Sequence, residues 1–312
     1  MANFWPEIPY PPWAQTCSAL QLWTQIVGKY RLARTPWLNH SWHATLYVDA
    51  DGLTTGLVPD GTQAVTVRLD LRAHRLAVCA SSGATSEFAL EPMSVASFHR
   101  RFLHALRTVG GTAVFHGRPN EIPEATPFAE DDRRRPYDRN AVERFHHALV
   151  NVATVFGQFR TGFIGKSSPV HLFWGSFDLA VTRFSGRVAP SHPGGIVNLP
   201  DAVTREAYSH EVSSAGFWPG GQGIDYPAFY SYAYPTPAGF EGARIEPSSA
   251  FFHGTLGEFI LKYDDVRMAE HPEAVLMSFL DTTYRAAADC ARWDRAALEC
   301  NIGQAAQPRA VR

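Results

Sequence analysis

The chain is poor in cysteine, in lysine and in long hydrophobic runs, and each shortage excludes a class of protein. Its four cysteines form neither a CxxC pair nor a zinc-ligand spacing, which argues against a zinc module or a disulfide scaffold and predicts reduced thiols. No segment approaches the ~20 apolar residues of a membrane span. The start, MANFWPEIPYPPW, lacks the basic and apolar regions of a signal peptide. We therefore expect a cytoplasmic protein that does not enter a membrane.

The charge is also close to balanced. The 312 residues include 28 lysines and arginines against 30 aspartates and glutamates, a formal net charge of −2. This balance gives no electrostatic reason to expect nucleic acid or an acidic membrane as a partner. The composition is 45% hydrophobic and 19% charged, as in an ordinary globular chain long enough for one large or two medium domains.

Signatures of common catalytic sites are missing as well. There is no GxSxG, SxxK, P-loop or HExxH, and no GxGxxG with an acidic residue at the required distance. A few potential metal ligands occur at a loose spacing that matches no specific signature, namely His40, His43, His253 and Glu258. The metal and the cofactor, if the protein uses either, therefore stay unassigned.

The most distinctive segment is 166–187, KSSPVHLFWGSFDLAVTRFSGR. Its part 170–181 is almost continuously apolar at both side-chain parities, which predicts one strand covered on both faces. Asp178 lies inside this strand, and a buried carboxylate needs partners or a raised pKa. His171 and Asp178 would lie on opposite faces of a straight strand, unless Gly175 marks a bulge.

Two interpretations of Asp178 remain open at this stage. In the first, it is a pocket acid that works with a separate base or ligand group. In the second, it forms a structural ion pair with a buried arginine, Arg183 or Arg160, since buried charges are normally found paired.

A second distinctive segment is 208–220, YSHEVSSAGFWPG, which predicts a strand that ends in a Gly/Pro turn. His210 and Glu211 are adjacent, so they would point to opposite faces of that strand. Ser213 offers a hydroxyl in an apolar neighbourhood, and Trp218 adds an aromatic ring close to the turn. A pocket wall and a plain turn of the fold are both consistent with this pattern.

The rest of the chain predicts an α+β protein built from two mainly antiparallel sheet-plus-helix halves, about 1–135 and 136–300, packed around a buried central strand. The expected helices span about 14–27, 95–109, 139–159 and 272–293, and the expected strands about 42–48, 63–71, 76–80, 86–90, 208–220, 227–234, 251–253 and 258–261. Segments 86–106 and 257–287 resemble each other, which indicates either a duplication or a shared β-then-helix habit. The tail 301–312 is expected to fray.

Several long blocks carry a resemblance to a known family: WPEIP at 5–9, QIVGK at 25–29, SPVH at 168–171, FWGSFDLAVTRFSG at 173–186 and SHEVSSAGFWP at 209–219. In these blocks the chain resembles a bacterial family of unknown function, over essentially its whole length to about residue 298. The resemblance implies a single full-length unit and one site shared by segments 166–187 and 209–221. It transfers no activity.

We predict an enzyme that acts on a small molecule in a polar and aromatic pocket where these two segments meet. The predicted acid, base or ligand groups are His171, Asp178, His210 and Glu211. The predicted substrate-binding residues are Lys166, Trp174, Arg183, Ser213 and Trp218, with Lys166 and Arg183 anchoring an anionic group. The alternative is a non-catalytic small-molecule-binding or interaction module, in which the same polar groups pair with one another.

Overall fold

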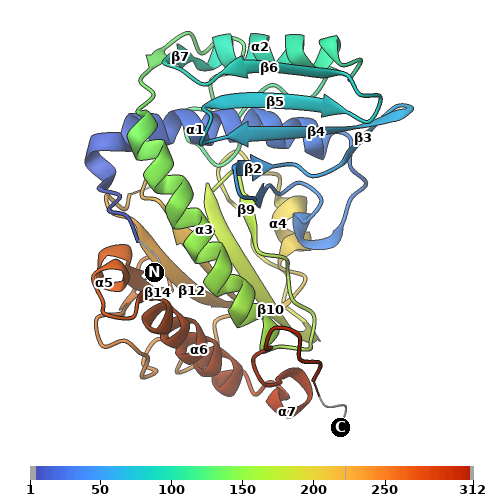
Figure 1. Ribbon diagram of the computed structural model, residues 1–312. Helices are drawn as coiled ribbons and strands as arrows, with labels where there is room; N and C mark the ends of the chain where they lie inside the picture. The colour runs from blue at the N-terminus through green and yellow to red at the C-terminus, as the bar shows by residue number, and fades with distance from the viewer. Residues whose placement is uncertain (1–4, 222, 310–312) are drawn as a thin grey trace.

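The computed structural model describes residues 5–221 and 223–309 and confirms the α+β class (Figure 1). Within these residues the first large sheet has the order β1 (Tyr47–Val48), β2 (Gly52–Thr54), β4 (Gln63–Asp70), β5 (Arg75–Ala80) and β6 (Thr85–Ala89), with β3 (Val58–Asp60) beside β4. The second has the order β13 (Phe251–His253), β14 (Glu258–Lys262), β12 (Ala228–Tyr234), β11 (His210–Trp218), β10 (Asp178–Val188) and β9 (His171–Phe173). Both sheets pair their strands antiparallel. A duplication of the two halves is not confirmed.

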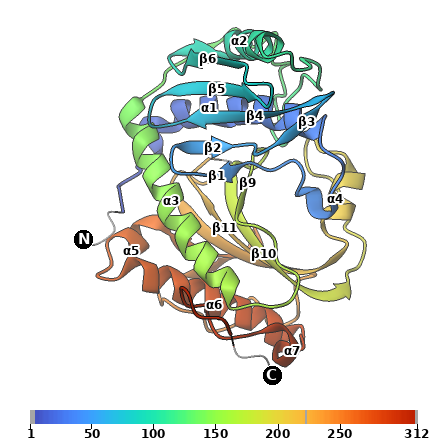
Figure 2. The same ribbon diagram turned by 45° about the vertical axis from the view of Figure 1, so that its right-hand side comes forward.

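Helices cover these sheets in layers. The long ones are α1 (Tyr10–Leu32), α2 (Val95–Thr108), α3 (Arg139–Thr161) and α6 (Pro272–Cys290); the short ones are α4 (Asp201–Ala207), α5 (Tyr263–Arg267) and α7 (Arg295–Leu298). A small sheet pairs β7 (Met93–Ser94) with β8 (Arg134–Arg135). Helices α1 and α2 pack together beside the first sheet, and α3 runs from the first sheet down to the second (Figure 2). No helix in the described part of the chain combines the length and the apolar character needed to cross a membrane.

The helices that carry a clear apolar stripe begin where the sequence predicts. The side chain of Ser94 accepts a hydrogen bond from the Ser97 N–H at the start of α2, and Asp138 caps α3 in the same way through Ala141. Helix α1 is longer than predicted. Prolines fit its first turn, because the N–H that they lack would have no partner there, and Gly28 lies inside the helix instead of ending it.

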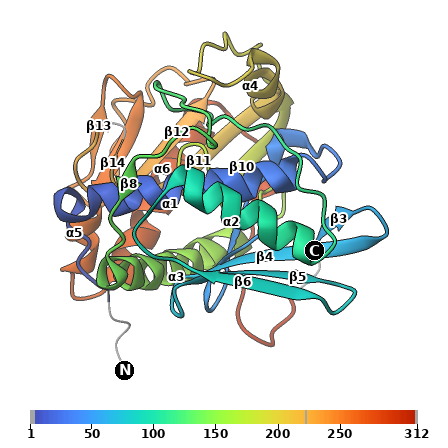
Figure 3. The same cartoon turned by 90° about the horizontal axis from the view of Figure 1, so that it is seen from above.

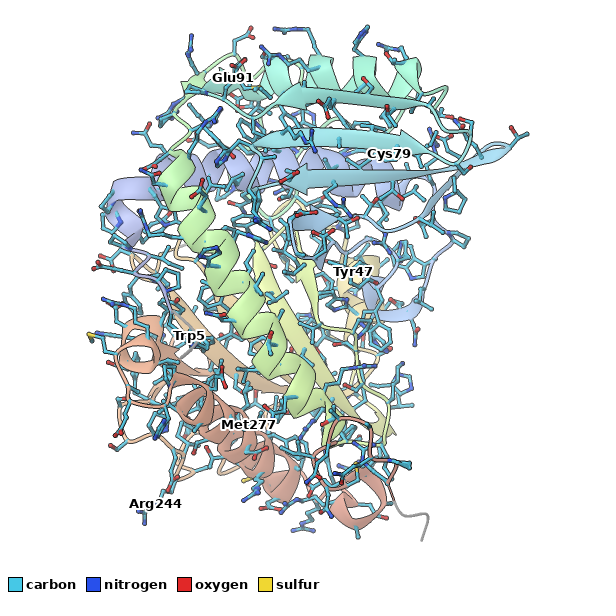
Figure 4. The ribbon with its side chains drawn as sticks, viewed as in Figure 1. Trp5, Tyr47, Cys79, Glu91, Arg244 and Met277 are labelled. Carbon is cyan, nitrogen blue, oxygen red and sulfur yellow. The ribbon has the colours of Figure 1, made fainter. Side chains whose placement is uncertain are left out.

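The N-terminal arm, residues 5–9, packs on the body of the protein ahead of α1. Trp5 is 6% exposed, and its ring centre lies 6.0 Å from that of Tyr263 at the start of α5 (Figure 4). The Tyr263 hydroxyl donates to the backbone oxygen of Pro6 at 2.9 Å. Near the C-terminus, Gly303 N–H donates to Thr161 Oγ1 at 2.9 Å. The segment 301–312 was predicted to fray, and its residues 310–312 lie outside the described residues.

The prediction of one continuous strand over 170–181 is wrong. Residues 174–177 form a tight turn, in which Phe177 adopts a φ of 58°, so that β9 and β10 fold back on each other. Asp178 pairs with Phe173, and Ala180 with His171. Because directly paired residues point to the same side of a sheet, the turn places His171 and Asp178 on one face. The turn could not be recognised within the apolar run, because the strands on both sides of it are buried.

The second sheet has two differently covered faces. Helices α3 and α6 pack on one of them, and α4 lies on the opposite side from α3 (Figure 3). Side chains along β10 point alternately to one face of the sheet and to the other. Leu179, Val181 and Arg183 point toward the long helices, whereas Asp178 and Thr182 point to the other face. That other face forms the floor of the cavity described next.

Candidate functional site

A cavity of about 510 Å³ lies over the face of the second sheet that α3 and α6 leave uncovered. Alternate residues of β10, β11, β12 and β14 form its floor. Its walls come from the C-terminal half of α1, from loops 37–44 and 116–121, and from the segment 196–208 that contains α4. The lining is mostly aromatic and aliphatic, but it includes three carboxyl groups and one lysine: Glu121, Asp178, Glu258 and Lys29.

Asp178 lies at the centre of the floor and is 4% exposed. Gly216 has no side chain, and the Tyr230 ring fills that space, since a Cβ at Gly216 would overlap it. This placement lets the Tyr230 hydroxyl donate to one carboxylate oxygen of Asp178, while Ser176 donates to the other. Burial raises the pKa of Asp178, and the two hydroxyl donors oppose that rise. Asp178 and Tyr230 therefore form a buried, hydrogen-bonded acid pair.

Glu121 approaches the same centre from the opposite wall. Its backbone has a φ of 58°, and its N–H donates to the oxygen of Val197 at 3.1 Å. The carboxyl group packs on Gly175, where any Cβ would overlap it. Burial and the neighbouring Asp178 raise the pKa of Glu121 to about 7, although Lys29 acts in the opposite direction. Glu121 can therefore gain or lose a proton near neutral pH.

Among the described residues that line the cavity, Lys29 is the only lysine, and none is an arginine. It lies near the end of α1, is 3% exposed, and donates to Asn120 Oδ1. Its Nζ lies 3.5 Å from His116 Nδ1 and 5.4 Å from the centre of the Trp174 ring. Burial lowers the pKa of Lys29 to about 8, and Glu121 opposes this shift. Its amine is therefore only partly protonated in mildly alkaline solution.

Glu258 supplies the third carboxyl group, from the start of β14. Its Oε2 atom is buried and receives no hydrogen bond. Burial and the nearby Asp178 raise the pKa of Glu258 to about 8. A row of rings lines the cavity with these acids: the Trp218 and Tyr230 ring centres lie 4.4 Å apart, and the Tyr208 and Tyr232 hydroxyls are 2.9 Å apart.

Three of the residues predicted from the sequence line this cavity: Asp178, Trp174 and Trp218. Trp174 is fixed by its Nε1, which donates to the oxygen of Ala44 at 2.7 Å. Lys166 does not line the cavity itself but contacts a residue that does: its Nζ is 2.6 Å from Nε2 of His40. The segments 166–187 and 209–221 thus do meet at one cavity.

Other predicted site residues lie on the helix-covered face of the sheet. The Arg183 guanidinium donates to the Phe159 oxygen at 2.5 Å and stacks 3.5 Å from the Phe159 ring centre. Ser213 is its direct partner across the ladder, so it points the same way. Glu211, on the same parity of β11, forms a salt bridge of 2.6 Å with Arg187.

The ion-pair interpretation of Asp178 is therefore wrong. Asp178 bonds to hydroxyl groups, Arg183 lies on the far face, and the Nε of Arg160 donates to the Ser168 oxygen at 2.6 Å. His210 lies near the cavity without lining it. Its Nδ1 is 3.1 Å from Ser209 Oγ, and its ring centre is 6.0 Å from that of His40.

His171 shares the face of Asp178 but is fully buried beside the cavity. Its ring lies among aromatic neighbours, 4.7 Å from Phe173 and 6.4 Å from Tyr47, which is labelled in Figure 4. Both of its ring nitrogens lack a hydrogen-bond partner. Burial, with Arg31 and Arg160 nearby, lowers the pKa of His171 to about 3. The imidazole is therefore neutral in the folded protein.

This burial predicts the effect of His171→Leu. The unfolded chain protonates His171 below about pH 6.5 whereas the folded chain does not, so the wild type loses stability as the pH falls through that value. We expect the leucine variant to gain about 1 kcal/mol relative to the wild type between about pH 7 and pH 5.5. Urea unfolding at both pH values measures this gain. A constant difference between the two proteins would show that His171 titrates alike in the folded and the unfolded chain.

The possible metal ligands do not converge. Among residues 5–221 and 223–309, no group of three or more His, Cys, Asp or Glu side chains is arranged to hold a metal ion. His40 Nδ1 is 2.8 Å from the oxygen of Ala207, and His43 Nδ1 is 3.3 Å from that of Leu38. His253 and Glu258 are paired across β13 and β14.

Two of the residues at the centre of the cavity, Lys29 and Glu121, were not predicted from the sequence. Lys29 belongs to the QIVGK block that carries the family resemblance, and lysine is rare in this chain. Those two signals together could have identified it. Glu121 lies in a proline-rich connector without periodicity, so only its contacts in the folded chain reveal it.

Comparison with known proteins assigns a family without assigning a reaction. Neither the curated proteins nor the solved structures provide a match to the chain. One family model matches residues 5–300, which include every strand of both sheets and every residue that lines the cavity. The chain therefore belongs to a family of unknown function, DUF5996.

Proposed function

We propose that the protein is an enzyme that acts on a small molecule by acid–base chemistry in this cavity. The observation that supports the proposal most is the convergence of three carboxyl groups on one aromatic-lined cavity without an arginine partner. In the described part of the chain, none of Glu121, Asp178 and Glu258 takes part in a salt bridge. Buried acids kept without a salt bridge are costly to a fold, and such sites are typical of catalysis.

The arrangement supports distinct roles for these groups. Asp178 and Tyr230 share a proton-bearing hydrogen bond at the floor, so that Asp178 can give a proton to a substrate atom or take one from it. Glu121 and Lys29 lie on the opposite wall with pKa values of about 7 and about 8. Values near neutrality suit a group that must donate and accept protons in one cycle. The aromatic side chains exclude water and hold the body of the substrate.

A cytoplasmic location in a bacterium is part of this proposal. The four cysteines are free thiols, which supports a reducing compartment, and the resemblance described above supports a bacterial source. The alternative function, a non-catalytic small-molecule-binding module, uses the same cavity. The two functions differ in outcome, because a binding module would release its compound chemically unchanged.

Turnover of a polar metabolite extract tests the proposal. The wild type, Asp178→Asn and the surface control Glu87→Gln are each incubated with the extract, and compounds are followed by mass spectrometry. Because Asn cannot exchange the proton, we expect a compound that the wild type and the control consume to be consumed at least about a hundredfold more slowly by Asp178→Asn.

Two results would contradict enzyme function at this site. The first is equal turnover by Asp178→Asn and the wild type, which would place the chemistry elsewhere. The second is a compound that binds the wild type stoichiometrically but is recovered unchanged, with no other compound consumed. That result would favour the binding module.

A further inference from the structure

We infer that the ligand of this cavity is an organic cation, an amine or ammonium group on an apolar or aromatic body. This inference rests on the proposed function of the cavity and specifies its substrate class. It follows from an unpaired buried carboxyl oxygen in the lining, from the excess of carboxyl groups over lysine, and from the arrangement of the aromatic rings.

Several donors of the lining are used within the protein. The hydroxyls of Ser176 and Tyr230 donate to Asp178, and Trp174 Nε1 donates to the oxygen of Ala44. Lys29 Nζ donates to Asn120. The Tyr208 and Tyr232 hydroxyls bond to each other, so one of them serves as the donor. Ser41 Oγ and Thr204 Oγ1 are buried in the lining without a partner, so free hydroxyl donors remain beside the carboxyl groups.

The carboxyl groups of the lining also keep unused hydrogen-bonding capacity. Glu258 Oε2 is buried and has no donor. A carboxylate oxygen can accept more than one hydrogen bond, so the hydroxyls bonded to Asp178 do not exhaust its capacity. Glu121 adds a third carboxyl group. The chemical complement of this surface is a group that brings N–H donors or positive charge, or both.

The charges of the lining point the same way. Three carboxyl groups face one lysine in the lining, and that lysine is already bonded to Asn120. The two residues expected from the sequence to anchor an anion do not line the cavity. Arg183 stacks on Phe159 on the far face, and Lys166 contacts His40 behind the wall. Any of these carboxyl groups that ionises would repel an anionic ligand, while an organic cation would favour its ionisation and pair with it.

The aromatic residues suit the same ligand. The Trp218 and Tyr230 ring centres lie 4.4 Å apart, and the Tyr230 and Tyr232 rings stack at 6.0 Å with an interplanar angle of 16°. This row crosses the floor beside Asp178 and Glu258. Ring faces attract cations, and the attraction grows when water is excluded. Ile196, Leu199 and Val203 in the opposite wall offer contacts to an apolar body.

Three indole compounds of similar size test the charge preference. Tryptamine carries an ammonium group, tryptophol a neutral hydroxyl, and indole-3-acetate a carboxylate. By calorimetry at neutral pH, we expect tryptamine to bind the full-length protein at least about tenfold more tightly than tryptophol, and indole-3-acetate to bind more weakly than both. In Glu258→Gln, tryptamine should lose about tenfold in affinity while tryptophol changes little. Glu87→Gln is the surface control.

Proton release gives a second readout. A cation beside Glu258 favours the ionised carboxylate, so binding of tryptamine should release a fraction of a proton near neutral pH. The binding heat should then differ between phosphate and Tris buffers for the wild type. The difference should shrink in Glu258→Gln. A merely steric role for Glu258 would leave the buffer dependence unchanged.

The inference is overturned if tryptophol or indole-3-acetate binds as tightly as tryptamine. It is also overturned if tryptamine fails to bind the folded protein at millimolar concentration, or if methyl glucoside binds in preference, which would indicate a carbohydrate pocket. These failures differ from failure of the proposed enzyme. A consumed compound that is neutral or anionic overturns only the cation class, whereas tight tryptamine binding without any turnover in the extract overturns only the enzyme.

Discussion

The substitution Glu258→Gln is expected to stabilise the protein increasingly as the pH rises, by about 2 kcal/mol between about pH 6 and pH 9. In the wild type, burial without a hydrogen-bond partner for Oε2 raises the pKa of Glu258 to about 8. The folded protein therefore holds a proton there that the unfolded chain has already lost. Glutamine has nearly the same shape and never ionises, so it avoids the cost of a buried negative charge.

The sign follows from proton binding. A carboxyl group whose pKa is raised on folding contributes its full stability below its unfolded value and loses that stability as the pH rises through the folded value. The loss for the wild type thus accumulates from the ordinary pKa of 4.5 upward and is nearly complete above the folded pKa of about 8. Water in the cavity screens part of the effect, so the expected change is smaller than the full shift would give.

Urea unfolding of both proteins at several pH values measures this difference. Lys29 and the buried histidines also change the stability of the wild type with pH, but they do so equally in the variant and cancel in the comparison. Glu87→Gln, on the exposed side of β6, should give a difference that is flat with pH. A flat difference for Glu258→Gln as well would show that a partner for its carboxylate exists in solution.

Periodicity predicted the parts of the fold in which one face of an element is buried. Helices α2 and α3 begin at their predicted residues because apolar side chains recur at steps of three and four after a capping residue. Strand β4 alternates between buried and exposed positions and was also predicted. The same reasoning failed at 170–181, where both arms of the β9–β10 hairpin are buried and only Gly175 and Ser176 mark the turn.

The candidate site was only partly predictable for a related reason. Asp178 stands out because a charge interrupts an apolar run. Arg183 gives the same signal, yet it points to the helix-covered face and stacks on Phe159. Strand parity distinguishes the two only once the start of β10 is known. Glu121 gives no local signal at all, because its position over Gly175 arises from contacts between distant parts of the chain.

A glycine pair in the two longest helices tests how tightly the cavity wall is packed. Gly28 in α1 lies against the Trp174 indole, and a Cβ at this position would overlap the ring. Trp174 is 8% exposed and fixed through its hydrogen bond to Ala44, so it has little room to move. We expect Gly28→Ala to destabilise the protein by about 1–3 kcal/mol, although alanine favours helices over glycine.

Gly157 in α3 provides the matched control, because a Cβ there would meet no atom within 4 Å. Gly157→Ala should therefore show only the helix preference of alanine, a gain of about 0.5–1 kcal/mol. Urea unfolding of both variants measures the opposite signs, and equal changes would show that Trp174 can leave Gly28 freely. Since Trp174 begins the turn that leads into Asp178, Gly28→Ala should also weaken tryptamine binding, while Gly157→Ala should not. The packing of one indole on one glycine would then connect the stability of the wall to the geometry of its acid.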